Sequence, residues 1–199
     1  MKTILFTNTM SFSDDSSMAA DLAKTIANYG KNVALIDCDL RQPAVHKLFK
    51  LPNKLGFSDV LQNNRSPLSV MHTSMNQHLS ILTSGSHLYT NFEIFNSQKM
   101  HVFLKRLKND FDNVIIHGPP FFYAEALSLA KMVDRVVLLI HPNTDHSEKS
   151  LAIIDKFHHT GATIVSLAAP GQSIQKVDQT AFTHRHLNLN HPIEQASSA

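Results

Sequence analysis

Short apolar segments alternate with helical hydrophobic patterns along most of this chain, and this alternation restricts the fold more than any other feature. Six segments read as buried strands: Thr3 to Phe6, Val33 to Ile36, Leu79 to Leu82, Val114 to Ile116, Val136 to Ile140 and Thr163 to Leu167. Strands separated by helices are typical of βαβ units, whose strands run parallel. The pattern predicts an α/β fold with a mainly parallel central sheet flanked by helices.

Four helices are expected between these strands. In the first, Met18, Leu22 and Ile26 recur at helical spacing, and Gly30 ends the pattern. The other three are expected at Gln98 to Lys108, Ala124 to Lys131 and Glu148 to His158. From about Gly171 onward Ser, Gln, His and Asn dominate. We therefore expect one domain over residues 1–170 and a polar, flexible tail over residues 171–199.

Composition excludes several classes of protein. The 199 residues are 43% hydrophobic, which is enough for a real core, and the formal net charge is only +2. No Lys/Arg cluster is long enough to indicate a nucleic-acid partner. No apolar run approaches the roughly 18 residues of a membrane span, and the N-terminus does not resemble a signal peptide. The single cysteine, Cys38, forms no intramolecular disulfide, so we expect a cytoplasmic protein with Cys38 as a small core residue.

The loops after the strands carry the informative motifs, because ligands of parallel α/β sheets bind beyond the carboxyl ends of the strands. The stretch LIDCDLRQP runs from Leu35 to Pro43, and GFSDVL follows from Gly56 to Leu61. Further along come FDNVIIHGPP, from Phe111 to Pro120, and the segment from Glu125 to Thr144. In this order the motifs resemble the cytoplasmic ATPase domain of bacterial tyrosine kinases of the capsular exopolysaccharide family. These kinases are relatives of the MinD and ParA P-loop ATPases, so the resemblance implies a three-layer P-loop NTPase-like fold.

The phosphate-binding loop departs from that family. A P-loop needs glycines whose backbone N–H groups close around phosphate, and a lysine that reaches the terminal phosphates. Here the loop runs from Ser11 to Ser17, with Phe12 and Asp14 at the glycine positions and Asp15 at the lysine position. Exchanging the cation for an anion about 4 Å from a phosphate loses roughly 4 kcal/mol of attraction and adds a similar repulsion. Micromolar affinity is only about −8 kcal/mol in total.

Other nucleotide contacts implied by the resemblance are also altered. His117 stands where the family has an aspartate that orders the magnesium shell, and Pro170 replaces a base-contacting asparagine. We interpret a vestigial nucleotide site made of Ser11, Phe12, Asp14, Asp15, Ser16, Ser17, His117 and Pro170. Ser16, Ser17 and the two aspartates also suit helix N-capping. What survives is Asp37 and Asp39, which either hold a residual cation or serve turn chemistry, with Arg41 beside them and Glu125 where relatives carry an aspartate.

Three further features have two interpretations each. The aromatic run Phe121, Phe122 and Tyr123 either fills the vacated pocket or meets a partner, or it is ordinary packing. The histidines lack the fixed spacing of a metal site, so we expect no metal. The basic residues Lys105, Arg106 and Lys108 are typical of a solvated helix face.

These observations favour a nucleotide-binding-deficient pseudokinase or pseudo-ATPase, without catalytic residues or a cofactor. By resemblance it would be a cytoplasmic regulatory or scaffold component of exopolysaccharide biosynthesis and export. Its partner would be a membrane chain-length regulator, the polysaccharide co-polymerase, or an intact kinase of the family, and it would reach the inner membrane only through that partner. The alternative is an active ATP-dependent tyrosine kinase or ATPase with a rearranged loop that uses ATP and Mg²⁺. A MinD-like or ParA-like positioning ATPase ranks last, because neither an amphipathic terminal helix nor a basic surface is evident in the sequence.

Overall fold

A seven-stranded sheet forms the centre of the computed structural model, which describes residues 2–8, 14–63, 65–86, 92–140 and 155–168. The strand order is β3-β4-β2-β5-β1-β6-β7, and every neighbouring pair is parallel except β3 and β4. The strands are β1 (Lys2–Asn8), β2 (Val33–Asp37), β3 (His72–Thr73), β4 (Leu79–Leu82), β5 (Asn113–His117), β6 (Arg135–Ile140) and β7 (Thr163–Ala168). The prediction of a mainly parallel α/β sheet is therefore confirmed.

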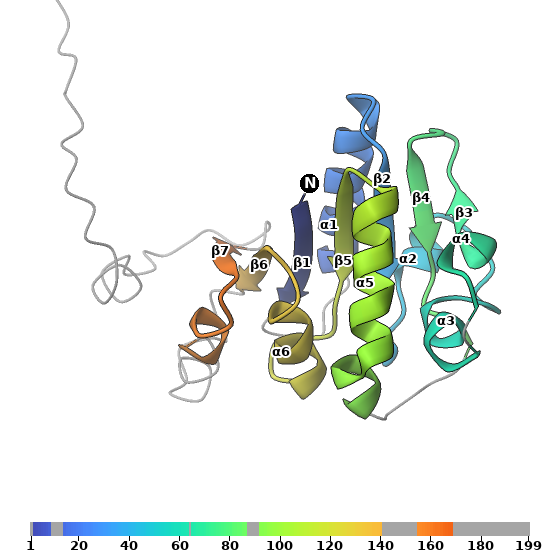
Figure 1. The fold of residues 1–199 in the computed structure, drawn as a ribbon. Coiled ribbons are helices and arrows are strands. Elements are labelled where there is room, and N and C mark those ends of the chain that lie inside the picture. The colour runs from blue at the N-terminus through green and yellow to red at the C-terminus, as the bar shows by residue number, and fades with distance from the viewer. Residues whose placement is uncertain (1, 9–13, 64, 87–91, 141–154, 169–199) are drawn as a thin grey trace, which may run out of the picture.

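Helices cover both faces of this sheet (Figure 1). They are α1 (Asp14–Asn28), α2 (Val45–Leu48), α3 (Phe57–Asn63), α4 (Pro67–Val70), the 3-10 helix η1 (Phe92–Asn96), α5 (Gln98–Asp110) and α6 (Ala124–Ala130). The helix expected around Met18, Leu22 and Ile26 and before Gly30, and the helices expected at 98–108 and 124–131, are confirmed. Of the fourth expected helix, residues 155–158 are helical and residues 148–154 lie outside the described part of the chain.

Two apolar layers hold the helices against the sheet, because successive side chains of a strand point to opposite faces. Leu5 and Ile36 contribute to the layer that α3, α5 and α6 cover, whereas Phe6 and Leu35 contribute to the layer beneath α1 and α2. The short strand β3 carries no hydrophobic alternation and was not predicted. It pairs antiparallel with β4 at the sheet edge, through two residue pairs.

Three strand ends meet where the site was predicted. In the register of the sheet, His117 at the end of β5 lies beside Phe6 of β1 on one side and beside Asp37 of β2 on the other.

Among the described residues, no helix has the length and apolar character needed to cross a membrane.

Candidate functional site

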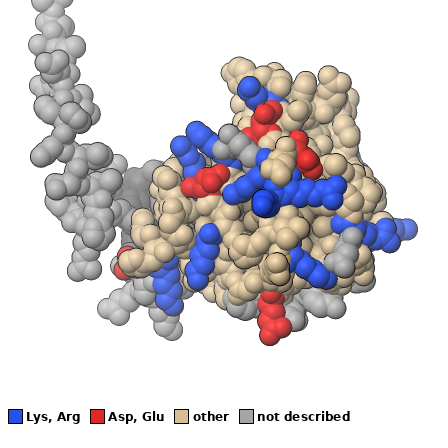
Figure 2. Space-filling model, viewed as in Figure 1, with Lys and Arg blue, Asp and Glu red and all other residues tan. Residues whose placement is uncertain are grey.

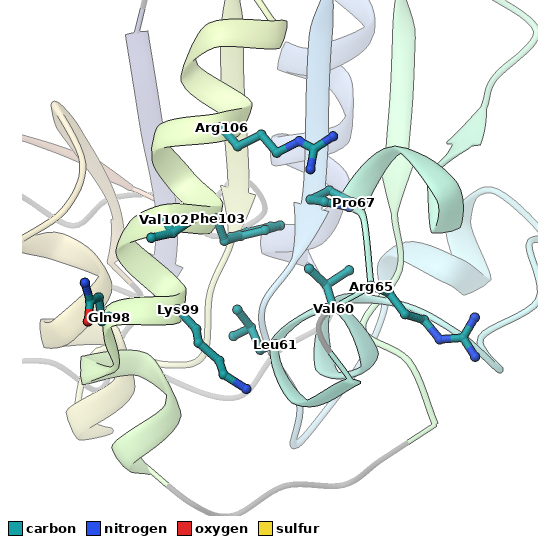
Figure 3. Close-up of a pocket in the computed structure, with 9 residues that line it drawn as sticks. All are labelled: Val60, Leu61, Arg65, Pro67, Gln98, Lys99, Val102, Phe103 and Arg106. Carbon is teal, nitrogen blue, oxygen red and sulfur yellow. The ribbon is translucent and has the colours of Figure 1, made fainter.

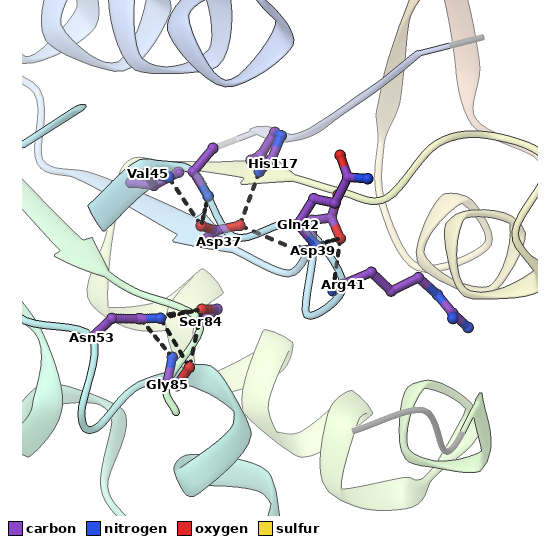
Figure 4. A network of polar contacts seen from close by, with 10 residues as sticks. Asp37, Asp39, Arg41, Gln42, Val45, Asn53, Ser84, Gly85 and His117 are labelled. Carbon is purple, nitrogen blue, oxygen red and sulfur yellow. Dashed lines mark hydrogen bonds and ion pairs between the residues drawn. The ribbon is translucent and has the colours of Figure 1, made fainter. Parts of the chain in front are cut away.

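Asp37 occupies the last position of β2 and is completely buried. Its Oδ1 atom lies 2.9 Å from Nδ1 of His117 and accepts a hydrogen bond from the backbone N–H of Asp39 at 3.3 Å. Its Oδ2 atom accepts hydrogen bonds of 3.0 Å from the backbone N–H groups of Ala44 and Val45, at the start of α2 (Figure 4). Both carboxylate oxygens are therefore engaged by the protein itself.

Asp39 organises the loop that follows β2. Its Oδ1 atom accepts hydrogen bonds from the backbone N–H groups of Arg41 and Gln42, each at 2.9 Å. This is the turn chemistry that a short acidic side chain supports. Burial raises the pKa of Asp39, and the charge of Asp37 acts in the same direction, while the two backbone hydrogen bonds and His117 oppose the shift.

Cys38 lies between the two aspartates and points into the core beneath α3, α5 and α6, as strand alternation predicts. It is fully buried. Burial, together with the charges of Asp37 and Asp39, raises the pKa of the Cys38 thiol well above its usual range. Since the thiolate is the reactive form, this cysteine is an inert core residue.

The residues that were predicted to survive beside the aspartates form an ion pair across the loop. Nη2 of Arg41 lies 2.7 Å from Oε1 of Glu125, whose side chain is only 8% exposed. The guanidinium group of Arg41 also lies over the ring of Tyr123, 4.3 Å from its centroid. The β2 loop is thereby tied to the first turn of α6.

The aromatic run has split roles. Phe121 is buried and packs against Phe157, with ring centroids 6.4 Å apart, so it is ordinary core. Tyr123 supports Arg41, and Phe122 stacks on Tyr123 while remaining 46% exposed. Packing accounts for Phe121 and Tyr123, and the exposed Phe122 is the member of the run that is available to a partner.

Much of the predicted phosphate loop lies outside the described residues. Ser11, Phe12 and Pro170 are outside them, and of Asp14 and Asp15 only the backbone, in the first turn of α1, is described. Ser16 is buried in that turn and Ser17 is partly buried. The predicted loop geometry and the capping roles therefore stay predictions.

A polar network between the end of β4 and the start of α3 was not predicted as a unit. Asn53 donates through its side-chain amide to the hydroxyl of Ser84 and to the carbonyl of Gly85, both at 3.0 Å (Figure 4). Oδ2 of Asp59 accepts from the backbone N–H of Gly56 at 2.9 Å. The GFSDVL motif marked the start of α3 in the sequence, whereas no sequence pattern singled out Asn53.

The described residues fit a magnesium ion poorly. Magnesium prefers carboxylate and water oxygens, but the neighbour of Asp37 is an imidazole, and the oxygens of Asp37 already accept internal hydrogen bonds. Within the described ranges, no group of three or more His, Cys, Asp or Glu side chains has the geometry of a metal site. The Asp37 and Asp39 pair serves the turn and the adjacent helix in this structure.

The seven-stranded, mostly parallel sheet with helices on both faces is P-loop ATPase-like. The family described as ATPase MipZ matches residues 2–146. The tyrosine-protein kinase YwqD of Bacillus subtilis is 34% identical over 183 residues, which are 92% of this chain and 77% of YwqD. The solved chimerical protein CapA2B2 superimposes with a TM-score of 0.76 at 26% identity, covering 84% of this chain and 75% of the other.

The kinase domain of the Escherichia coli tyrosine kinase ETK superimposes with a TM-score of 0.74 at 20% identity, and the match covers 88% of this chain and 71% of that domain. At this identity the likeness supports the fold alone. The chain spans 24% of the full-length E. coli kinase. The chain belongs to the bacterial tyrosine kinase family, within the MinD/ParA-like P-loop ATPase superfamily. This family is associated with capsule and exopolysaccharide synthesis.

Proposed function

We propose that this protein is a family member deficient in nucleotide binding, a pseudokinase that regulates or scaffolds exopolysaccharide synthesis without turning over ATP. The observation that carries the proposal is the use of Asp37. Its two oxygens accept four internal contacts, one of them with the imidazole of His117. A magnesium ion would have to displace these contacts from a fully buried carboxylate.

The charge pattern of the phosphate loop supports the same conclusion. Asp15 stands at the position where the family resemblance places the phosphate-binding lysine, and Asp14 stands at a glycine position. Two carboxylates at a triphosphate site repel the ligand that the family loop attracts. The internal contacts of Asp37 and the acidic residues of the phosphate loop therefore both disfavour the binding of Mg·ATP.

A regulatory role requires a partner. The likeness to the chimerical protein CapA2B2 supports a CapA-type membrane co-polymerase as that partner, through its cytoplasmic end. An intact family kinase is the second candidate. Pull-down with the cytoplasmic segment of the chain-length regulator tests this part, and we expect the captured amount to be equal with and without Mg·ATP.

The alternative function, an active tyrosine kinase with a rearranged loop, makes a different prediction. Residual magnesium binding at Asp37 and Asp39 would support phosphorylation of Tyr29, Tyr89 or Tyr123. A radiolabelled ATP assay on the wild type and on Asp39→Asn separates the two. We expect both to remain at background, whereas turnover in the wild type that Asp39→Asn abolishes would establish the enzyme.

A gain-of-function variant serves as the matched control for that assay. Phe12→Gly, Asp14→Gly, Asp15→Lys and His117→Asp together restore the residue types that the family resemblance places at these positions. We expect the combined variant to bind Mg·ATP detectably while the wild type does not. Because His117→Asp is itself destabilising, circular dichroism must show that the combined variant is folded. Equal behaviour of the two folded proteins would then mean that these positions do not decide nucleotide binding.

A further inference from the structure

A basic groove runs between α5 and the segment formed by α3 and α4, and none of its residues belongs to the candidate site. Its volume is about 350 Å³. Figure 3 shows Lys99 and Arg106 extending from α5 toward that segment. The lining residues are Val60, Leu61, Arg65, Pro67, Gln98, Lys99, Val102, Phe103 and Arg106.

The floor of the basic groove is apolar and firmly supported. Leu61 and Phe103 are almost completely buried, and the ring of Phe103 packs edge-on against Phe57 with centroids 5.5 Å apart. Val102, in contrast, is 61% exposed in the middle of α5. An occupant that covered Val102 would remove apolar surface from water without requiring the core to rearrange.

The rim of the basic groove carries one sign of charge. Arg65, Lys99 and Arg106 are exposed, and no carboxylate lines the groove. Arg106 lies 3.7 Å from Asp110, but neither Arg65 nor Lys99 makes an ion pair within the described ranges. Arg65 and Lys99 are therefore unneutralised cations beside an apolar surface, and Arg106 shares its charge with Asp110.

The positive charge continues across the outer face of α5. A second hollow on its other side is lined by His101, Leu104, Lys105, Lys108, Lys131 and Met132. Figure 2 shows Lys and Arg side chains across the middle of the face that carries α5, with Asp and Glu side chains beside them. Arg106 and Lys108 pair with Asp110 and Asp134, so the unpaired positive charge that the described residues place on this face lies at Lys105 and Lys131 and at the basic groove.

Three occupants can be compared on charge and shape. Residues 171–199 contain Lys176, Asp178, Arg185 and Glu194, so this segment has no net acidity to complement the rim. A membrane surface is anionic but requires a broad apolar helix face to bury, whereas Val102 is the one large apolar side chain that is exposed among the groove's lining residues. A peptide with carboxylates flanking an apolar side chain matches both the rim and the floor.

We propose that the basic groove binds an acidic, amphipathic peptide segment of a partner protein, with an apolar side chain against Val102 and carboxylates at Arg65, Lys99 and Arg106. The groove shares no residue with the Asp37 and His117 site. The proposal therefore does not rest on whether the protein binds nucleotide.

Fluorescence anisotropy with the full chain tests this proposal. The probe is a labelled synthetic helical peptide with leucines at i and i+4 flanked by glutamates, and the control peptides replace leucine by glutamine or glutamate by lysine. We expect saturable binding of the first peptide only, weakened by salt. Lys99→Glu/Arg106→Glu should weaken it about tenfold or more. Val102→Ser should weaken it about fivefold.

Matched variants distinguish the groove from general charge. Lys31→Glu/Lys47→Glu makes the same charge change at exposed positions outside the groove and should leave the affinity unchanged. Leu48→Ser is the control for Val102→Ser, because Leu48 is 45% exposed on α2. Thermal melting followed by circular dichroism checks that each variant is folded.

Four results would overturn the proposal. The first is that the acidic peptide does not bind, and the second is that the two charge-reversal pairs weaken its binding equally. The third is that the protein binds anionic vesicles and that Lys99→Glu/Arg106→Glu removes this binding. The fourth is that the protein sediments as a dimer that the same variant dissociates. The third result would assign the face to a membrane. The fourth would assign it to a second copy of the chain.

Discussion

Nδ1 of His117 lies 2.9 Å from Oδ1 of Asp37, and both side chains are withdrawn from solvent at the point where β5 and β2 end. The remaining oxygen of Asp37 holds the start of α2. Asp37 is thus part of an internal polar network at the carboxyl end of the sheet. Its role in this protein is to connect the sheet to the loop and helix that follow β2.

His117→Asp should destabilise the protein, because it places two carboxylates in contact where the imidazole now pairs with Asp37. We expect a loss of about 3–5 kcal/mol in the free energy of unfolding, because the variant leaves buried carboxylates without a compensating partner. Urea denaturation measures it, and added Mg²⁺ should recover part of the loss. The control is His117→Asn, whose amide still donates to Asp37 and which should lose only about 1–3 kcal/mol. Equal losses in the two variants, insensitive to Mg²⁺, would contradict the assigned role.

Asp39→Asn should change how stability depends on pH. Burial and Asp37 raise the pKa of Asp39 above its ordinary value of 3.8, so the folded protein binds this proton more tightly than the unfolded chain. The contribution of Asp39 to stability is therefore full at low pH and declines as the pH rises from 3.8 through the raised pKa.

The amide of Asn keeps an oxygen that can accept from the N–H groups of Arg41 and Gln42, but it does not ionise. Asp39→Asn should therefore be at least as stable as the wild type at neutral pH, with a flatter pH profile above 3.8. Urea denaturation over a series of pH values provides the comparison. Parallel profiles for the two proteins would show that Asp39 titrates alike in the folded and unfolded states.

Arg41→Ala should cost about 2 kcal/mol of stability, because it leaves the buried carboxylate of Glu125 without its cation. Glu125→Gln should cost about 1 kcal/mol, since the amide oxygen still accepts from Arg41. Lys24→Ala is the matched control: its 3.2 Å pair with Asp21 is exposed on both sides and should contribute less than about 1 kcal/mol. Thermal or chemical denaturation ranks the three, and a loss in Lys24→Ala as large as in Arg41→Ala would refute the role of burial.

Gly56→Ala should be the most damaging of the glycine substitutions considered, because a Cβ there would overlap the carbonyl oxygen of Thr83 and the amide nitrogen of Gly85. Backbone atoms of the β4 connection cannot move aside without breaking the 2.7 Å hydrogen bond from Phe57 to Thr83. We expect a loss of about 3 kcal/mol. Gly30→Ala meets open space and only a positive φ of 74°, so it should lose about 1 kcal/mol. A reversed order of stabilities would contradict the close approach.

Hydrophobic periodicity was sufficient to predict the strands of the core. Leu79–Leu82 was predicted with its observed ends, and the other five predicted strands differ from the observed ones at one or both ends, by at most two residues at each end. Buried parallel strands are continuous apolar runs, which a sequence displays directly. The edge strand His72–Thr73 has no such pattern, because its pairing depends on the neighbouring strand β4 and not on its own side chains.

The site was predictable in position but not in its contacts. Parallel topology places the ends of β2 and β5 at one edge of the sheet, the edge at which the sequence placed the candidate site residues. No sequence pattern specified that an oxygen of Asp37 would cap α2, or that Arg41 would pair with Glu125 across 84 positions. Such contacts depend on the distance between loops, which only the folded chain defines.

Isothermal titration of the full chain with Mg·ATP tests the central claim most directly. We expect no measurable heat of binding at millimolar nucleotide, because Asp37 is occupied by internal contacts and Asp15 stands at the position of the family lysine. Binding with a Kd below about 100 μM, or roughly −5.5 kcal/mol, that depends on Mg²⁺ and is lost in Asp39→Asn would contradict the account and identify a working nucleotide site.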